Sequence, residues 1–284
     1  MTDAAFHAAY EEAMALWPVP VERRGTVTPY GRTRVHVCGP ADAPPLVLLH
    51  GGGTTSAVWY ALAPALAATH RVYAVDQMGT PGLSVPGERA VRRPADLESW
   101  LDGVLDGVLD DHGAASAAVL GHSYGGWLAL RYAAHTPGRV HRLVLLDPTQ
   151  CFAGFRTSYL ARAVPLFVRP GERSTRRLLA WETRGDPPAP ELVRLMGRGA
   201  VAFRGAKPVT GPRPDTAGLR AAGVPVLVLL AEHSRAHDLH RVAAGAARAL
   251  PDARVETLPG VSHHSVPYAA SGEAARRIGG FLTG

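Results

Sequence analysis

The sequence predicts an α/β fold with a mostly parallel, doubly wound sheet, and three observations carry this prediction. Short, continuously apolar runs, typical of strands buried on both faces, alternate with longer segments of helical periodicity. Glycine- and proline-rich turns separate them. Polar residues that could carry chemistry directly follow several runs, at the carboxyl ends where such sheets bind ligands. With 284 residues, 46% of them hydrophobic, the chain can form one large domain with an insertion.

The first 75 residues predict a helix, a hairpin and two buried strands. Apolar side chains recur at helical spacing before Trp17 and Pro18. Two alternating segments then flank the turn Pro29-Tyr30-Gly31, which is a hairpin signal. The elements expected in this part are a helix at 3–16, strands at 21–28, 32–38 and 46–49, a helix at 57–68 and a strand at 72–75.

The middle of the chain continues the alternation. An amphipathic helix is expected at 94–111, because its leucines and valines fall on one face. It is followed by a strand at 116–120, a helix at 127–134 and a strand at 140–146. After a different segment, the pattern resumes with a strand at 224–230, a helix at 238–250, a strand at 254–258 and a helix at 272–282.

Residues 149–223 break this pattern. Short amphipathic pieces alternate there with proline and glycine, and no buried strand is expected. The stretch 148–223 holds thirteen Arg or Lys and five Asp or Glu, a net charge of +8, against +6 for the whole chain. We therefore expect residues 1–148 and 224–284 to form the core. Residues 149–223 would form a helical cap, inserted after the sixth strand, over the strand ends.

The hexapeptide Gly121-His122-Ser123-Tyr124-Gly125-Gly126 stands between an apolar run and a helical stretch. A sharp glycine-flanked turn in this context exposes a serine hydroxyl above a sheet. The next backbone N–H, that of Tyr124, would lie at a helix N-terminus, where an oxyanion is stabilised. Alone the pattern is weak evidence, because a glycine loop that caps an ordinary helix has the same residues.

A serine nucleophile needs a base, and position selects His263 among the thirteen histidines. His263 follows the last predicted strand, in Pro259-Gly260-Val261-Ser262-His263-His264, at the same sheet edge as Ser123. His264 is the less favoured alternative. A solvated pair of loop histidines is the non-functional interpretation.

In this order the motifs resemble the α/β-hydrolase superfamily, in its capped, single-domain branch. The matching pieces are His50-Gly51-Gly52-Gly53, the loop 76–84, the Gly121–Gly125 turn and the segment 259–263. The resemblance implies Ser123 as nucleophile, His263 as base, and the backbone N–H groups of Gly52 and Tyr124 as an oxyanion hole. It also implies structural roles for His50 and Asp76. The loop after Asp76 has one residue more than the common family form.

The acid of the triad departs from the family pattern. Where the family carries it, after the penultimate strand, this chain has Ser234, which has no carboxylate. Asp147, at the end of strand 140–146, is the favoured substitute, although it could instead be a strand-end cap. Asp238 is the main alternative and could equally cap a helix. Glu232, or a dyad without an acid, completes the set of possibilities.

Composition excludes several other classes of protein. The chain is basic, but its only lysine is Lys207, and it has no zinc spacing, aromatic RNA-binding motif or basic heptad helix. A nucleic-acid partner is therefore not expected. The two cysteines, Cys38 and Cys151, form no Cys-x-x-Cys pair, so no metal or cofactor site is expected. No signal peptide or membrane span is expected either, and a cytoplasmic monomer or homodimer is the default.

The function expected is that of a serine hydrolase that cleaves an ester, lactone or thioester of a medium-sized apolar small molecule. Gly53 and Trp59 of the core should contact the substrate. The predicted cap offers aromatic walls in Phe152, Phe155, Tyr159, Phe167, Trp181 and Phe203. Two alternatives remain: a lyase or cyclase that uses Ser123 and His263 as acid–base groups, and a non-catalytic ligand-binding protein.

Overall fold

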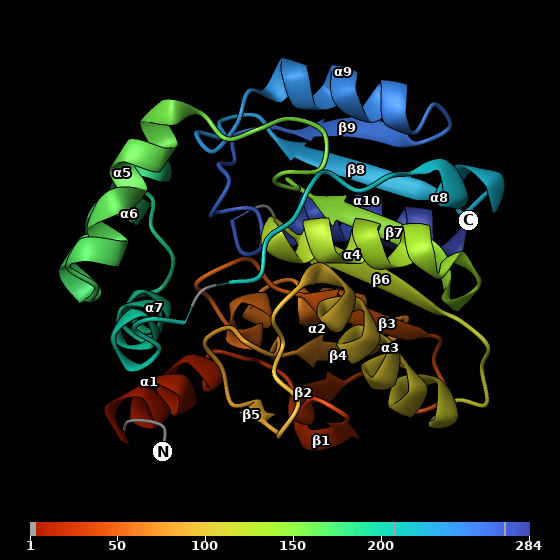
Figure 1. Ribbon diagram of the computed structural model, residues 1–284, viewed down its shortest axis with the longest axis horizontal. Helices are drawn as coiled ribbons and strands as arrows, with labels where there is room; N and C mark the ends of the chain where they lie inside the picture. The colour runs from red at the N-terminus through yellow and green to blue at the C-terminus, as the bar shows by residue number, and fades with distance from the viewer. Residues whose placement is uncertain (1–3, 207, 270) are drawn as a thin grey trace.

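A nine-stranded sheet forms the centre of the molecule in the computed structural model, which describes residues 4–206, 208–269 and 271–284 (Figure 1). Its strands lie in the order β1-β2-β4-β3-β6-β7-β8-β9, and the short β5 pairs with β2. From β4 to β9 every pairing is parallel, whereas β1, β2 and β5 are antiparallel to their neighbours. The mostly parallel α/β sheet predicted from the sequence is confirmed.

The strand bounds follow the apolar runs closely. The hairpin is confirmed, because β1 and β2 pair along their whole length around the predicted turn. The two-residue β5 was not expected. The strands are β1 Glu22–Thr28, β2 Gly31–Cys38, β3 Pro45–Leu49, β4 Arg71–Val75, β5 Val85–Pro86, β6 Ala117–His122, β7 Val140–Leu146, β8 Val226–Ala231 and β9 Arg254–Leu258.

The helices of the core cover both faces of the sheet. They are α1 Ala4–Met14, the 3-10 helix η1 Ser56–Tyr60, α2 Ala63–Leu66, α3 Pro94–Asp110, α4 Tyr124–His135, the 3-10 turn η2 Pro137–Arg139, α9 Leu239–Ala249 and α10 Ser271–Thr283. The single helix expected at 57–68 is wrong: it is split into η1 and α2, and Pro64, without an N–H to donate, stands in the first turn of α2. Residue 3 of the first predicted helix lies outside the described residues, as does Lys207.

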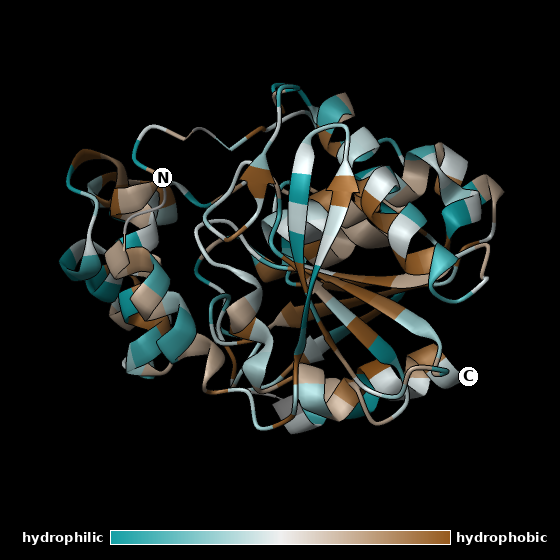
Figure 2. Ribbon diagram, turned by 90° about the horizontal axis from the view of Figure 1, so that it is seen from below, coloured by the Kyte–Doolittle hydropathy of each residue, from teal (hydrophilic) through white to brown (hydrophobic). Residues whose placement is uncertain are grey.

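Two apolar clusters, one on each face, hold the sheet between its helices. Alternate residues of β3 belong to different clusters: Val47 and Leu49 pack with α3 and α4, and Leu46 and Leu48 pack with α1, η1, α2 and α10. Figure 2 shows the apolar strands running between the two helical layers. The strands are apolar on both faces because both faces are covered. This arrangement leaves the carboxyl ends of the strands as the open edge.

Between β7 and β8, the described residues form four helices: α5 Thr157–Val168, α6 Glu172–Glu182, α7 Pro190–Ala202 and α8 Ala217–Ala221. Figure 1 shows α5, α6 and α7 together to one side of the sheet, beside α1. Phe203, which follows α7, contacts Phe6 of α1 edge-on, with ring centroids 5.3 Å apart. The last helix, α8, packs instead on α4 of the core, where Gly218 closely approaches the Ala134 carbonyl. Within the part of the chain that the structure describes, no helix is long and apolar enough to cross a bilayer.

Candidate active site

Ser123 occupies a strained turn between a buried strand and a helix. It stands between β6 and α4 with φ 53° and ψ −114°, a backbone conformation that L-residues rarely adopt. The flanking glycines make the turn possible, because a Cβ on Gly121 would lie 2.3 Å from the Gly125 carbonyl oxygen. A Cβ on Gly125 would lie 2.2 Å from the Leu49 carbonyl oxygen. The sequence pattern around Ser123 therefore reflects steric need at this turn.

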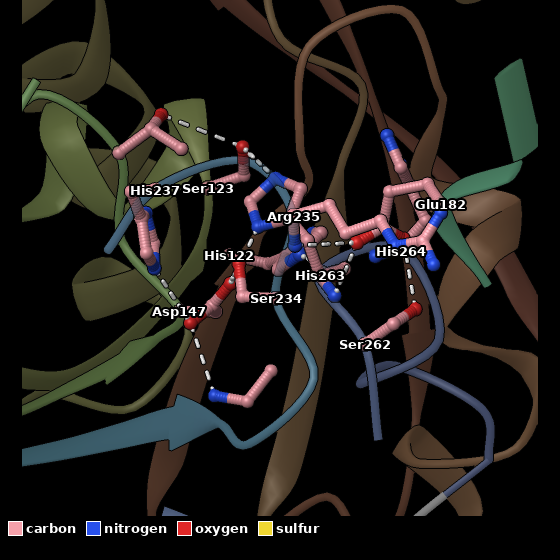
Figure 3. Close-up of polar contacts among 12 residues, drawn as sticks. His122, Ser123, Asp147, Glu182, Ser234, Arg235, His237, Ser262, His263 and His264 are labelled. Carbon is pink, nitrogen blue, oxygen red and sulfur yellow. Dashed lines mark hydrogen bonds and ion pairs between the residues drawn. The ribbon is translucent and has the colours of Figure 1, made fainter. Parts of the chain in front are cut away.

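Three side chains from different parts of the chain form a continuous hydrogen-bonded row (Figure 3). The Oγ of Ser123 lies 2.9 Å from Nε2 of His263, and Nδ1 of His263 lies 2.6 Å from Oδ2 of Asp147. All three residues are buried, at 8%, 1% and 0% exposure respectively. His264 points away from Ser123 and lies 3.0 Å from the Tyr159 hydroxyl through its own Nε2.

The carboxylate of Asp147 accepts three hydrogen bonds besides the one from His263. The Ala231 N–H donates to Oδ1 at 3.0 Å, and the Ser234 hydroxyl donates to Oδ2 at 2.8 Å. His237, whose Nε2 lies 2.9 Å from Oδ1, is almost fully buried. Ser234, at the position where the family places its acid, thus supplies a donor to a carboxylate that comes from the neighbouring strand end. Nothing in the sequence pattern pointed to His237.

The two titratable groups of this row have opposite pKa shifts. Burial alone would raise the pKa of Asp147, but the charges and hydrogen bonds of His237 and His263 hold it well below its ordinary range. Burial alone would lower the pKa of His263, yet the hydrogen bond and charge of Asp147, with the charge of Glu182, raise it above its ordinary value. Asp147 is therefore ionised near neutral pH and stabilises the imidazolium form of His263.

The other two candidate carboxylates lie elsewhere. Asp238 caps helix α9, where its Oδ1 accepts the Arg241 N–H at 3.1 Å, and it pairs with Arg156. Glu232 is exposed and accepts the Gly260 N–H at 2.8 Å. Neither hydrogen-bonds His263 in the described residues.

The glycine-rich segment after β3 lies against the start of α4. A Cβ placed on Gly52 would be 3.7 Å from the Tyr124 Cβ, and Tyr124 is the first residue of α4, so its N–H has no acceptor within the helix. Gly53 is exposed and has a φ of 74°, which favours glycine. His50 is fully buried, with Nδ1 2.8 Å from the Gly51 carbonyl, which anchors this turn.

Asp76 is a structural anchor at the end of β4. Its Oδ1 accepts both the backbone N–H and the hydroxyl of Ser56, at 2.9 and 2.6 Å. Its Oδ2 accepts the Tyr10 hydroxyl and the Leu83 N–H, each at 2.7 Å. One buried carboxylate thus joins α1, η1 and the loop 76–84. The helical spacing of apolar side chains before Trp17 did not indicate this polar role of Tyr10.

Three of the expected aromatic residues form a row beside His263. Phe155 stacks on Tyr159 with ring centroids 5.7 Å apart, and the centroids of the Tyr159 and Trp181 rings are 6.4 Å apart. Tyr159 also meets the His263 ring edge-on at 6.2 Å. Trp181 carries the guanidinium of Arg235 over its face at 4.9 Å. These rings place apolar surface next to the Ser123–His263 pair.

The remaining expected aromatic residues make no ring contact with His263 in the described part of the chain. Phe152 packs closely on Gly245 of α9. Trp59 is fully buried in the apolar cluster around α1 and touches the His122 ring edge-on at 6.5 Å. Phe167 is 75% exposed on the outer face of α5, and Phe203 packs on α1. No ring contact joins Phe167 to the Ser123–His263 pair in the described residues, so its place in a wall of the site stays a prediction. The helical periodicity of the segment did not indicate which face of α5 would be turned inward.

A hydroxyl, an imidazole and a carboxylate joined in this order can act as nucleophile, general base and orienting acid. Set above the carboxyl ends of a parallel sheet, on a strand–turn–helix, this is the arrangement of an α/β hydrolase. The sequence model of the alpha/beta hydrolase family matches residues 46–277. The chain belongs to this family, and the resemblance noted in the sequence is confirmed.

Within the family, the chain is similar to carboxylesterases of Bacillus subtilis. An uncharacterized carboxylesterase, nap, is 31% identical over 268 residues, covering 91% of this chain and 86% of the relative. The crystal structure of carboxylesterase CesB (YbfK) superposes with a TM-score of 0.86 at 30% identity, over 98% of this chain and 96% of that one. The structure of naproxen esterase gives a TM-score of 0.86 at 27% identity, over 99% of both chains.

Proposed function

We propose that this α/β hydrolase cleaves carboxylic esters through an acyl-enzyme on Ser123, with His263 as general base and Asp147 as the acid. The observation that carries the proposal is the unbroken row from the Ser123 Oγ through His263 to Asp147, at 2.9 and 2.6 Å. The similarity to carboxylesterases along nearly the whole chain supports the ester as the bond that is broken.

In the proposed reaction, His263 Nε2 takes the Ser123 proton as Oγ attacks the ester carbonyl. The negative oxygen that forms would accept hydrogen bonds from the N–H groups of Gly52 and Tyr124. When the tetrahedral intermediate collapses, the carbon–oxygen bond to the alcohol breaks and His263 returns the proton to the leaving oxygen. Water, activated by the same imidazole, then attacks the acyl group and releases the acid and free Ser123.

We infer that residues 149–223 act as a cap that selects the substrate. The support is the aromatic row of Phe155, Tyr159 and Trp181, which comes from this segment and lies beside His263. Such flat apolar surface favours a medium-sized acyl or aromatic group. Gly53, next to the proposed oxyanion N–H groups, would allow the substrate to approach the backbone. Phe152 and Trp59, by contrast, would act on the site only through packing.

The reaction class is tested by the fate of the oxygen of water. We expect hydrolysis of a p-nitrophenyl ester panel in ¹⁸O-water to place one ¹⁸O in the carboxylic acid product, read by mass spectrometry, with the best turnover at medium acyl length. Lyase or cyclase chemistry on the same residues would release product without ¹⁸O. A purely ligand-binding protein would give no product at all.

The raised pKa of His263 predicts the pH dependence. The base works only when deprotonated, so kcat/KM should fall as pH drops through the pKa of free-enzyme His263. Since Asp147 and Glu182 raise that pKa over the effect of burial, we expect the acidic limb to lie above pH 6.5, the ordinary value. Initial rates in constant-ionic-strength buffers measure it. A limb well below that value would contradict the charge arrangement described around His263.

We further propose that the working enzyme is a cytoplasmic monomer or homodimer acting on a small molecule. Light scattering coupled to size-exclusion chromatography distinguishes the two oligomeric states.

A further inference from the structure

A buried carboxylate other than Asp147 lies behind the loop that carries the base. Glu182 is the last residue of α6 and has no exposed surface. Its Oε1 accepts the N–H of His263 at 3.0 Å, and its Oε2 accepts the N–H of His264 at 3.0 Å (Figure 3). The Ser262 hydroxyl and the Arg235 N–H donate to the same carboxylate, at 2.8 and 3.2 Å. Glu182 thus binds the peptide of the base directly.

The His263 peptide is clamped from two sides. Its N–H donates to Glu182, and its carbonyl oxygen lies 2.9 Å from Nε2 of His122, the residue before Ser123. One clamp therefore comes from β6 of the core and the other from α6 of the segment 149–223. Together they fix the loop from which the His263 imidazole reaches both Ser123 and Asp147.

The position of Glu182 lowers the stability of the folded protein. A negative charge at the C-terminus of a helix opposes the helix dipole, and burial of a charge costs free energy. No arginine pairs with Glu182 in the described residues, because the Arg235 guanidinium donates to the Trp181 carbonyl instead. A residue that is unfavourable for stability in this way is expected at a functional site.

Glu182 acts on His263 in two ways, through its hydrogen bonds to the backbone and through its negative charge. Burial would raise the pKa of Glu182, but the charges of His264 and His263 and the donors around it lower that pKa, so the carboxylate is ionised near neutral pH. Burial instead lowers the pKa of His264 to about 4, which leaves His263 as the imidazole that gains from this charge. The other titratable groups that face Glu182 are Tyr159 and Tyr268, together with Arg235.

We propose that Glu182 is a positioning residue for catalysis: it holds the His263 loop in register from the side of α6 and favours the imidazolium that forms during the reaction. The inference rests on the proposed function of His263 as base. It also makes the segment 149–223 a support of the base as well as a wall of the site. A shift of α6 would therefore change the alignment of His263 as well as the space for substrate.

Glu182→Gln tests the proposal with little change in shape. The amide replaces one acceptor oxygen by an NH₂ group, which then faces backbone N–H donors that cannot turn away. We expect kcat to fall about 10- to 100-fold, the equivalent of one hydrogen bond to a charged group. KM should change little, because Glu182 does not face the substrate. The acidic limb of kcat/KM should move to lower pH, because the negative charge near His263 is lost.

Glu232→Gln is the matched control, since Glu232 accepts one N–H of the same loop, from Gly260, but is exposed. It should leave kcat and the pH limb unchanged. Thermal unfolding curves show whether a loss of activity comes from unfolded protein or from a lower kcat of the folded enzyme. A folded Glu182→Gln with wild-type kcat and an unmoved limb overturns the proposal, as does a loss that only tracks the unfolded fraction.

Glu182→Asp covers the case in which the amide variant does not fold. It keeps the charge but shortens the reach by one methylene, so kcat should fall while the pH limb stays nearer the wild-type position. Wild-type kcat in this variant overturns the proposal. Failure of the proposed function itself would look different, because Ser123→Ala would then retain turnover whatever the Glu182 variants do.

Discussion

Replacing Ser123 by alanine is expected to lower kcat for ester hydrolysis by about a million-fold, to the rate left by binding and the oxyanion donors alone. The reason is that no other hydroxyl can take its place: the Thr149 hydroxyl lies 3.5 Å from the Ser123 Oγ, and no hydrogen bond joins it to His263 in the described residues. The measurement is steady-state turnover of a p-nitrophenyl ester, after removal of any wild-type contaminant.

Ser116→Ala provides the matched control for this change. Ser116 stands just before β6, at the opposite end of the strand from Ser123, and its Oγ lies 3.2 Å from Nδ1 of the exposed His141. It should leave kcat unchanged. Retention of activity in folded Ser123→Ala would remove Ser123 from the reaction.

Replacing Asp147 by asparagine is expected to lower kcat by about 10³- to 10⁴-fold. The amide keeps the volume, but its NH₂ group must face donors that surround the carboxylate on every side, and the His263 Nδ1–H loses its charged acceptor. The tautomer of His263 that leaves Nε2 free to accept the Ser123 proton is then no longer favoured. Steady-state kinetics with a saturating ester measure the loss.

Asp238→Asn is the comparison that separates the two candidate acids. Asp238 caps α9 and pairs with Arg156. Because asparagine caps a helix about as well as aspartate, Asp238→Asn loses only the surface ion pair, so it should lower stability by less than about 1 kcal/mol and leave kcat nearly unchanged. If Asp238→Asn, and not Asp147→Asn, removed the activity, the assignment of the acid would be wrong.

The acid position also admits a rescue experiment. The Ser234 hydroxyl lies 2.8 Å from the Asp147 Oδ2 that meets His263. A carboxylate introduced by Ser234→Asp in the Asp147→Asn background should therefore recover at least about tenfold in kcat, equivalent to about 1.4 kcal/mol of transition-state stabilisation. In the wild-type background the same substitution places two carboxylates together and should lower activity.

Much of the fold follows from the sequence because its strands are buried on both faces. Val47 and Leu49 serve one apolar cluster and Leu46 and Leu48 the other, so the run is continuous and easily detected. The sharp turn at Ser123 was also predictable, because only glycine fits at positions 121 and 125 and both glycines are visible in the sequence.

The interactions between distant segments were not predictable in the same way. Glu182 and His237 meet the His263–Asp147 pair from separate helices and loops, and a periodic pattern carries no signal for such contacts. The error at 57–68 has a local cause. The periodicity predicted one continuous helix, but Pro64 stands in the first turn of a separate helix, α2. Phe167 shows another limit of periodicity. It marks a helix as amphipathic but does not tell which side chains will be covered, and Phe167 is 75% exposed.

The most direct test of the proposed chemistry is the site of covalent labelling by a fluorophosphonate, read by intact mass and peptide mapping. We expect one adduct per chain, on the peptide that contains Ser123, formed rapidly in the wild type and far more slowly in Asp147→Asn. Ser123→Ala should remain unlabelled. An adduct on another residue, or a folded wild-type protein that hydrolyses esters but takes no label, would contradict the assignment of Ser123 as the nucleophile.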